Sequence, residues 1–221
     1  MQRFEEIYQR ALERKGPALE AGLSAPGPAD ELREIPDHRF LARMTRSIFQ
    51  AGFVWKVIEA KWDGFEAAFQ GFNPHVWAHA PDEKLEALAS DERIVRNYQK
   101  IKTVRPNASM ILEAGRDRGG FGGFLADWPA NDQIGLMDYL GKHGSRLGGM
   151  TAQYFLRFAG WDAYILSRDV VAALIAAGVV DRAPTSKAAK QAVQGAFNDW
   201  QEESGRPYPQ ISRVLAQSID A

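Results

Sequence analysis

The stretch that decides how this chain folds is a turn of small residues followed by a large aromatic side chain, Gln50-Ala51-Gly52-Phe53-Val54-Trp55. Apolar residues precede it at three- and four-residue spacing from Phe40 to Ile48, and Asp37 is placed to cap the start of that helix. Apolar residues continue after the turn as far as Trp62. The pattern predicts two helices joined at Gly52, with Trp55 near the start of the second.

The rest of the sequence is also periodic in the manner of helices. It has no alternating strand pattern and no Asn-Gly or Asp-Gly turn between strand-like segments, so we expect an all-α fold. Further helices are predicted over residues 4–15, 94–113, 132–140, 149–159, 169–177, 186–203 and 209–217, with one more starting at 81. Loops are predicted over 16–36 and 115–123, which are rich in proline or glycine, with Phe121 and Phe124 as anchors in the second.

Composition limits the possible classes of protein. With 221 residues, 45% hydrophobic and 25% charged, the chain is long enough for one substantial globular domain. It has no apolar run near the ~18 residues of a membrane span, no signal-peptide core and no cysteine, so we expect a cytoplasmic protein that contacts no membrane. A net charge of −1 argues against a generally basic, non-specific DNA binder, although a local patch would suffice for binding at one site.

A glycine-rich turn over residues 141–149 separates two of the predicted helices. Backbone N–H groups at the start of the second helix would form an anion site suited to a DNA phosphate, and Gly144, Gly148 and Gly149 would permit close approach. Arg146 adds positive charge. The alternative is a simple helix–helix turn with glycine caps.

A second basic segment runs from Arg93 to Arg105 and contains no acid. It includes Arg96, Lys100 and Lys102, and these cations are suited to contact a DNA backbone. The alternative is a solvated helix face whose charges are balanced by neighbouring acids.

These stretches resemble the DNA-3-methyladenine glycosylase I family of base-excision repair enzymes. The run 50–55 is similar to a family Gln-Ala-Gly-Leu-Ser-Trp run, the segment 91–101 to a basic family helix, and 147–152 to the helix-hairpin-helix of base-excision glycosylases. The resemblance is firmest over 40–112 and extends to 139–173. It implies a two-lobed helix-hairpin-helix glycosylase fold, with the pocket between the lobes and the hairpin at its rim.

As domains, we expect a single glycosylase-like unit over residues 1–221. It would consist of an N-terminal arm over about 1–36, a helical body over about 37–182 that includes the hairpin 141–149, and C-terminal helices over about 183–221.

The resemblance also implies the base-binding residues. Trp55 would stack on a flipped base, where a cationic purine gains cation–π attraction, and Phe53 lies in the same run. Tyr8 would be the family's N-terminal aromatic that faces Trp55. Read without the resemblance, a core tryptophan is the commoner case for Trp55, and for Tyr8 packing on the core is equally expected.

The sequence departs from the family at the catalytic positions. Ser47 stands three residues before the Gln-Ala-Gly run, where the family has a glutamate that binds the damaged base. Glu59 is a possible substitute, one turn after Trp55, although we expect it to face solvent. Ser167 falls where the wider superfamily carries a catalytic aspartate, an absence shared with this branch, and Asp169 is expected to cap a helix or form an ion pair.

No metal and no cofactor is expected. The family ties its termini with zinc held by two cysteines and two histidines, but this chain has no cysteine, and Asp169 stands at one of the histidine positions. His75 and His79 flank Trp77 and are expected at the surface.

The predicted function is hydrolysis of the N-glycosidic bond of an alkylated purine, with 3-methyladenine as the expected base, by base flipping in double-stranded DNA. A monomer is expected. No lyase step is expected, because Gly149 and Met150 occupy the position of the lyase lysine. The alternative is a non-catalytic or altered-specificity relative that binds DNA or a free base.

Overall fold

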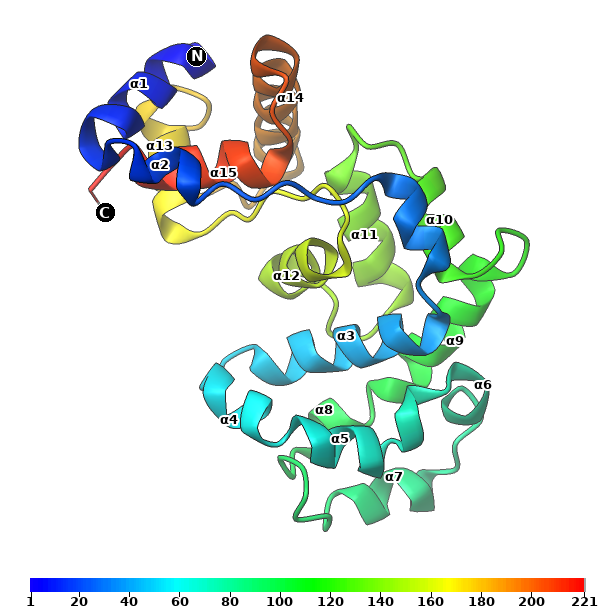
Figure 1. Ribbon diagram of the computed structural model, residues 1–221. Coiled ribbons are helices and arrows are strands. Elements are labelled where there is room, and N and C mark those ends of the chain that lie inside the picture. Colours follow the sequence, from blue (N-terminus) through cyan, green and yellow to red (C-terminus); the bar gives the residue numbers. More distant parts are fainter. Residues whose placement is uncertain (221) are drawn as a thin grey trace. The chain divides into compact units, whose positions relative to one another are not determined.

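The computed structural model describes residues 1–220 and is built of helices, with no strand in that range (Figure 1). The predicted all-α fold class is therefore confirmed. Within the same range, no helix combines the length and the apolar character needed to cross a bilayer.

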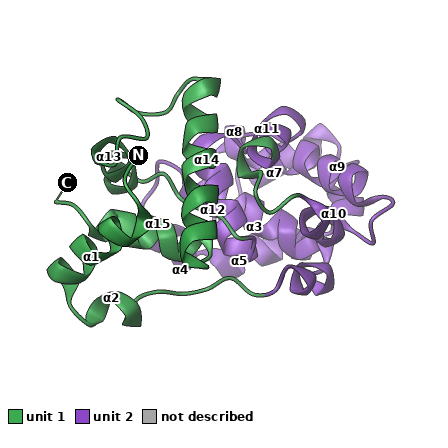
Figure 2. Ribbon diagram, turned by 90° about the horizontal axis from the view of Figure 1, so that it is seen from above, with its two compact units in different colours: residues 1–27, 129–135, 162–221 green, residues 28–128, 136–161 purple. Residues whose placement is uncertain are grey.

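Contacts divide the described residues into two compact units, coloured separately in Figure 2. The first unit comprises residues 1–27, 129–135 and those from 162 onward, and the second comprises 28–128 and 136–161. Each unit is therefore discontinuous in sequence. The expected division into an arm, a body and C-terminal helices stays a prediction beside this grouping by contacts.

The first unit contains α1 (Phe4–Lys15), α2 (Ala18–Ala21), α13 (Arg168–Ala176), α14 (Lys187–Ser204) and α15 (Tyr208–Gln217). Helix α15 packs against α1, α13 and α14. The core between them is aromatic, with Tyr164 stacked on Phe197 at 4.1 Å between ring centroids. Trp200 and Tyr208 pack edge-on against the same Phe197 ring. This unit therefore has its own hydrophobic core.

The second unit contains η1 (Ala29–Glu34), α3 (Asp37–Gln50), α4 (Trp55–Ala60), α5 (Trp62–Ala68), η2 (Gln70–Phe72), α6 (Pro74–Trp77), α7 (Asp82–Leu88), α8 (Tyr98–Ile101), α9 (Val104–Gly115), α10 (Phe121–Asp127) and α12 (Gly149–Ala159). Helix α11 (Gln133–His143) begins in the first unit and continues into this one.

Helix α3 is the central element of the second unit. Its apolar side chains at three- and four-residue spacing, among them Phe40, Met44 and Ile48, are buried, as the sequence predicts. Burial of each such side chain contributes about 1.5–3 kcal/mol. Helices α9 and α12 both pack against α3, and α12 is the helix that follows the glycine-rich turn. This packing brings the hairpin segment to the helix that precedes the Gln50–Gly52 turn.

The predicted continuous helix over 94–113 is wrong. Residues 91–97 form turns and irregular chain, and the segment then divides into α8 and α9. The side-chain oxygen of Asn97 accepts the N–H of Lys100 at 3.2 Å and caps α8, so a new helix begins there. Pro106 lies in the first turn of α9, where a missing N–H costs little.

Two predicted loops also contain helices. The stretch 16–36 includes α2 and η1, and the stretch 115–123 runs into α10. Asp37 does not cap its own helix. Its Oδ1 instead accepts the N–H of Phe121 at 2.7 Å, at the start of α10. Phe121 and Phe124 are buried, as expected for anchors, but they anchor a helix.

Candidate functional site

The turn between α3 and α4 is fixed by a buried lysine. Lys100 donates hydrogen bonds from Nζ to the carbonyl oxygens of Phe49 at 3.0 Å and Ala51 at 2.7 Å. It thereby binds carbonyl groups that the end of α3 leaves without helical partners. Burial, and to a lesser degree the charge of Arg146, lowers the pKa of Lys100. Gly52 follows with φ of +68°, a conformation that glycine adopts without strain.

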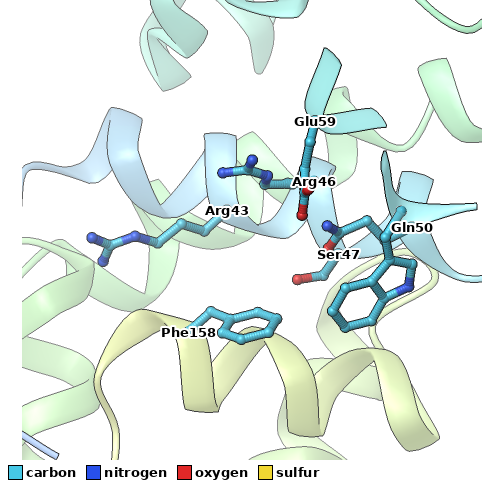
Figure 3. Close-up of a pocket in the computed structure, with 7 residues that line it drawn as sticks. Arg43, Arg46, Ser47, Gln50, Glu59 and Phe158 are labelled. Carbon is cyan, nitrogen blue, oxygen red and sulfur yellow. The ribbon is translucent and has the colours of Figure 1, made fainter. Parts of the chain in front are cut away.

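A pocket of about 280 Å³ opens beside this turn. It is lined by Arg43, Arg46, Ser47, Gln50, Trp55, Glu59 and Phe158, from α3, α4 and α12 (Figure 3). A neighbouring hollow of about 320 Å³ shares Ser47, Gln50 and Trp55 and adds Met150, Thr151 and Tyr154. All of these residues belong to the second unit. The volume is near the lower end of the ~300–1,000 Å³ range of small-molecule pockets, which suits a ligand the size of one base.

The indole of Trp55 packs against two aromatic rings and also lines the pocket. Tyr154 and Phe158 pack against it in T-shaped geometry at 5.1 Å and 6.0 Å between ring centroids. Trp55 is nevertheless 37% exposed, so the alternative of a fully buried core residue is wrong. A ring that is fixed by neighbours and still accessible is suited to stack on an incoming flat ligand.

Polar groups line the wall beside Trp55. Ser47 and Gln50 are 5% exposed each, and the side chains of both line this pocket and the hollow beside it. Glu59 extends from α4 into the same pocket, toward the side chains of α3 (Figure 3). Glu59 is exposed, as expected, and it also lines the pocket. The pocket offers a hydroxyl, an amide and a carboxylate to one ligand.

Two arginines of α3 complete the pocket. Arg46 lies with its guanidinium 4.9 Å from the centre of the Trp62 ring. Arg43 lies over Phe40 at 5.9 Å and donates to the carbonyl oxygen of Ala159 at 3.4 Å. Sequence reasoning missed both arginines, together with Tyr154 and Phe158. The spacing of the two aromatics at i, i+4 on α12 is the signal in the sequence that could have indicated their shared face.

The hairpin turn is tied to α9 through Asn107. Its Oδ1 accepts the N–H of Ser145 at 2.7 Å, and its Nδ2 donates to the Ser145 carbonyl oxygen at 3.2 Å. The N–H of Gly144 donates to Leu140, so neither Gly144 nor Ser145 has an N–H left for a ligand. Arg146 adopts φ of +58° in this turn.

The start of α12 is different. A side chain added at Gly148 or at Gly149 would meet no atom within 4 Å, and no side chain caps this helix. The first-turn N–H groups of a helix have no intrahelical acceptor, so the open end at Gly148 and Gly149 is the part of the hairpin that can meet an anion.

Other predicted site residues lie elsewhere. Phe53 is 43% exposed on the turn, with Lys100 Nζ 5.7 Å from its ring centre. Tyr8 is in the first unit, where its hydroxyl donates to Glu20 at 2.6 Å and Arg206 covers its ring. Its base-binding role stays a prediction, and Tyr154 and Phe158 are the aromatics that contact Trp55.

Ser167 also lies in the first unit. Its hydroxyl accepts the N–H of Val170 at 3.3 Å and caps α13. Asp169 is therefore not the cap. It pairs with Arg168 at 3.5 Å, which agrees with the alternative of an ion pair. The catalytic role of Ser167 stays a prediction.

The basic segment 93–105 is largely balanced by acids. Arg93 pairs with Asp91 at 2.6 Å, Arg105 with Asp82 at 2.7 Å and Arg96 with Glu92 at 3.8 Å. These contacts favour the reading of a balanced surface over that of a dedicated DNA-binding face.

His75 and His79 are exposed, as expected, and they flank the buried Trp77. Within residues 1–220, no three side chains of histidine, aspartate or glutamate gather as a metal site would require. The absence of zinc stays a prediction.

Residues 33–138 match the sequence model of a family described as methyladenine glycosylase. Among solved structures, the chain is similar to a 3-methyladenine DNA glycosylase I in complex with 3-methyladenine, with a TM-score of 0.52 and 22% identity over 68% of this chain and 90% of that one. It is also similar to 3-methyladenine DNA glycosylase I from Staphylococcus aureus, with a TM-score of 0.51 and 21% identity over 70% of this chain and 91% of that one. The expected helical glycosylase fold is confirmed.

Proposed function

We propose, from the match of residues 33–138 to the methyladenine glycosylase model, that the protein is a DNA glycosylase of the 3-methyladenine type. It would hydrolyse the N-glycosidic bond of an alkylated purine in double-stranded DNA, with 3-methyladenine as the base to test first. The reaction places it at the first step of base-excision repair.

One observation carries the proposal: the accessible Trp55 and the carboxylate of Glu59 line the same pocket. A purine alkylated on a ring nitrogen is cationic in DNA and already activated as a leaving group. Stacking on Trp55 would hold such a base by area and by cation–π attraction. Glu59 would provide the acceptor that the family places at the position of Ser47, because a carboxylate attracts a cationic base and a hydroxyl does not.

The chemistry requires little more than binding and water. The oxygen of a water molecule bonds to C1′ of the sugar as the bond from C1′ to the base nitrogen breaks. The base leaves with the bonding electron pair as a neutral molecule, and the proton that the attacking water loses passes to the solvent. Ser47 and Gln50 have unpaired polar groups beside Trp55, so either can orient that water or the base edge. A covalent lyase step is not proposed, since Gly149 and Met150 occupy the position where a lysine would be needed.

The open start of α12 supports a role for the hairpin in holding DNA. Met150 and Thr151, the residues after Gly149, line the hollow beside Trp55. A phosphate bound by the N–H groups at Gly149 would therefore bring a flipped base close to the pocket.

An excision assay on duplex DNA methylated at adenine N3 tests the proposal. We expect release of free base and an intact strand that breaks only after alkali. Glu59→Gln should slow release about 10²-fold or more if its charge is used on the cationic base. Glu86→Gln, an exposed carboxylate on α7, is the matched control and should leave the rate unchanged.

The second candidate function is binding without this excision, or excision of a different base. It is favoured by Ser47, which replaces the family glutamate. Binding of abasic duplex or free base by a protein that releases no methylated base would support it and overturn the first.

A further inference from the structure

The pocket has two ends of different chemistry. Trp55, Ser47 and Gln50 form a flat, hydrogen-bonding end, whereas the guanidinium groups of Arg43 and Arg46 extend along α3 away from Ser47 and Gln50 (Figure 3). The two arginines are three residues apart, which places them on one face of the helix. A ligand that fills the pocket therefore meets a base-binding end and a cationic end.

The two arginines have no acidic partner. Among residues 1–220, no carboxylate lies within ion-pair distance of Arg43 or Arg46, although Glu59 lines the same pocket. The nearby Glu66 is already engaged, because it binds Arg39 through both oxygens at 2.9 Å and accepts from Trp62 at 3.0 Å. The cationic end therefore carries charge that the protein itself does not neutralise.

Arg46 also has an unused donor. Its Nε is buried and has no hydrogen-bond acceptor, while the ring of Trp62 fixes its guanidinium plane from one side. An unsatisfied buried donor costs free energy unless a ligand supplies the acceptor. Burial and the charge of Arg39 lower the pKa of Arg43, as expected for a cation without a counter-ion.

We propose that Arg43 and Arg46 form a phosphate subsite of this pocket, so that the pocket binds a base as its nucleotide in preference to the free base. A planar guanidinium presents paired donors that match phosphate oxygens, and two guanidinium groups line this one pocket. The assignment of the Trp55 end to a base rests on the proposed function, whereas the assignment of the arginines rests on their own contacts. The phosphate belongs either to a free nucleotide or to the DNA backbone beside a flipped base.

Calorimetric titration of the full chain tests this subsite. The probes are deoxyadenosine, its 5′- and 3′-monophosphates, and inorganic phosphate. We expect at least one monophosphate to bind about tenfold or more tightly than the nucleoside, the scale of one charge-assisted hydrogen-bonded pair. Arg43→Gln and Arg46→Gln should each reduce that advantage, and the double variant should abolish it. Lys56→Gln removes a nearby exposed charge outside the pocket and should leave the advantage intact.

Further measurements distinguish a phosphate of the DNA backbone from that of a free nucleotide. Short duplex DNA with an abasic analogue should lose affinity in the arginine variants, with a salt slope reduced by about 1 per lost contact, if the subsite holds a backbone phosphate. If only mononucleotide binding falls, the ligand is a free nucleotide. Arg46→Lys keeps the positive charge but loses the paired donors of the planar guanidinium. The fraction of nucleotide affinity that this variant retains therefore measures the contribution of charge alone. Circular dichroism and melting curves confirm that each variant is folded.

Equal affinity for nucleoside and monophosphates would overturn the subsite, and so would a nucleotide advantage that survives in the folded double variant. Failure of the proposed function would be distinct. A protein that excises no methylated base but prefers nucleotides through these arginines would retain the subsite, and an active glycosylase without that preference would lose only the subsite.

Discussion

Two tryptophans, one in each unit, differ in their burial and in the hydrogen bonding of their indole N–H groups. Trp200, in the first unit, is 1% exposed, donates its indole N–H to the carbonyl oxygen of Gln2 at 3.1 Å and packs against Phe197. Trp55, in the second unit, is 37% exposed and its indole N–H has no acceptor among the described residues. A buried and paired indole stabilises its own unit, whereas an open and unpaired one is available to a ligand.

The polar side chains repeat this difference. In the first unit, Gln133 exchanges two hydrogen bonds with the backbone of Tyr164, and Gln194 bonds with Tyr164, Tyr208 and Asn198. In the pocket of the second unit, Ser47 and Gln50 are just as buried but have no such partners. Polar side chains that line a cavity, and are not used by the protein's own hydrogen bonds, indicate binding more strongly than any one residue type does.

The largest effect on stability is expected from replacing the buried tryptophan of the first unit. Trp200→Ala removes a fully buried ring and its hydrogen bond, and should lower the free energy of unfolding by about 3–5 kcal/mol. Urea unfolding followed by circular dichroism measures it. Trp55→Ala is the comparison and should cost less, about 1–3 kcal/mol, because its ring packs against Tyr154 and Phe158 but is 37% exposed. Equal losses in the two variants would show that Trp55 is a structural residue like Trp200.

The affinity for a purine base should depend on Trp55, although the stability of the protein depends more on Trp200. Trp55→Ala should weaken binding of a purine base by about 1–3 kcal/mol, the scale for stacking on an aromatic side chain. Titration of 3-methyladenine into the folded variant measures it, with affinity expressed per folded molecule. Unchanged affinity would remove Trp55 from the site and leave the pocket without its flat surface.

Some residues of the pocket could be predicted from the sequence and others could not. Trp55 could be located because the run that begins at Gln50 contains it, and Ser47 because it lies three residues before that run. Glu59 is exposed, as the sequence predicts, but helical periodicity does not show that it also lines the pocket. Arg43 and Phe158 were missed because they meet only when α12 packs on α3, a contact between segments far apart in the sequence.

The helices show the same limit. The amphipathic pattern of α3 is strong, and its buried residues match the prediction. The break before α8 was missed because Asn97 lies in a segment that also reads as helical, and its capping bond to Lys100 outweighs that weak preference. The prediction that Asp37 caps its own helix is wrong because its carboxylate accepts the N–H of Phe121, which is distant in sequence. Sequence patterns predicted local order, and tertiary contacts decided the exceptions.

The two glycines of the hairpin allow a finer test of the second unit. A side chain at Gly148 would meet no atom within 4 Å, whereas one at Gly144 would lie 2.7 Å from the carbonyl oxygen of Leu140. Gly148→Val should therefore fold normally yet weaken binding of any duplex DNA by about 1 kcal/mol, the scale of one hydrogen bond, while free base binds as before. Gly144→Val should lower the melting temperature first. Electrophoretic mobility shift and thermal melting separate the two, and a Gly148→Val protein with full DNA affinity would exclude the phosphate role of this turn.

The smallest expected effect concerns the paired carboxylate of Glu20 in the first unit. Hydrogen bonds from Tyr8 and Arg206, the latter at 2.7 Å, lower the pKa of Glu20. A lowered pKa means that the pairing contributes stability above the unfolded value of about 4.3, and that this contribution is lost as the pH falls through the lower folded value. Because the Glu20 side chain is 46% exposed, solvent screening should keep the contribution below about 1 kcal/mol. Glu20→Gln should therefore be slightly less stable than the parent at pH 7, and the gap should close as the pH falls below about 4. Glu13→Gln on α1, an exposed carboxylate, should show no gap at either pH. Urea unfolding at several pH values measures all three proteins, and a gap for Glu20→Gln that stays constant down to acid pH would mean that its ionisation does not stabilise the first unit.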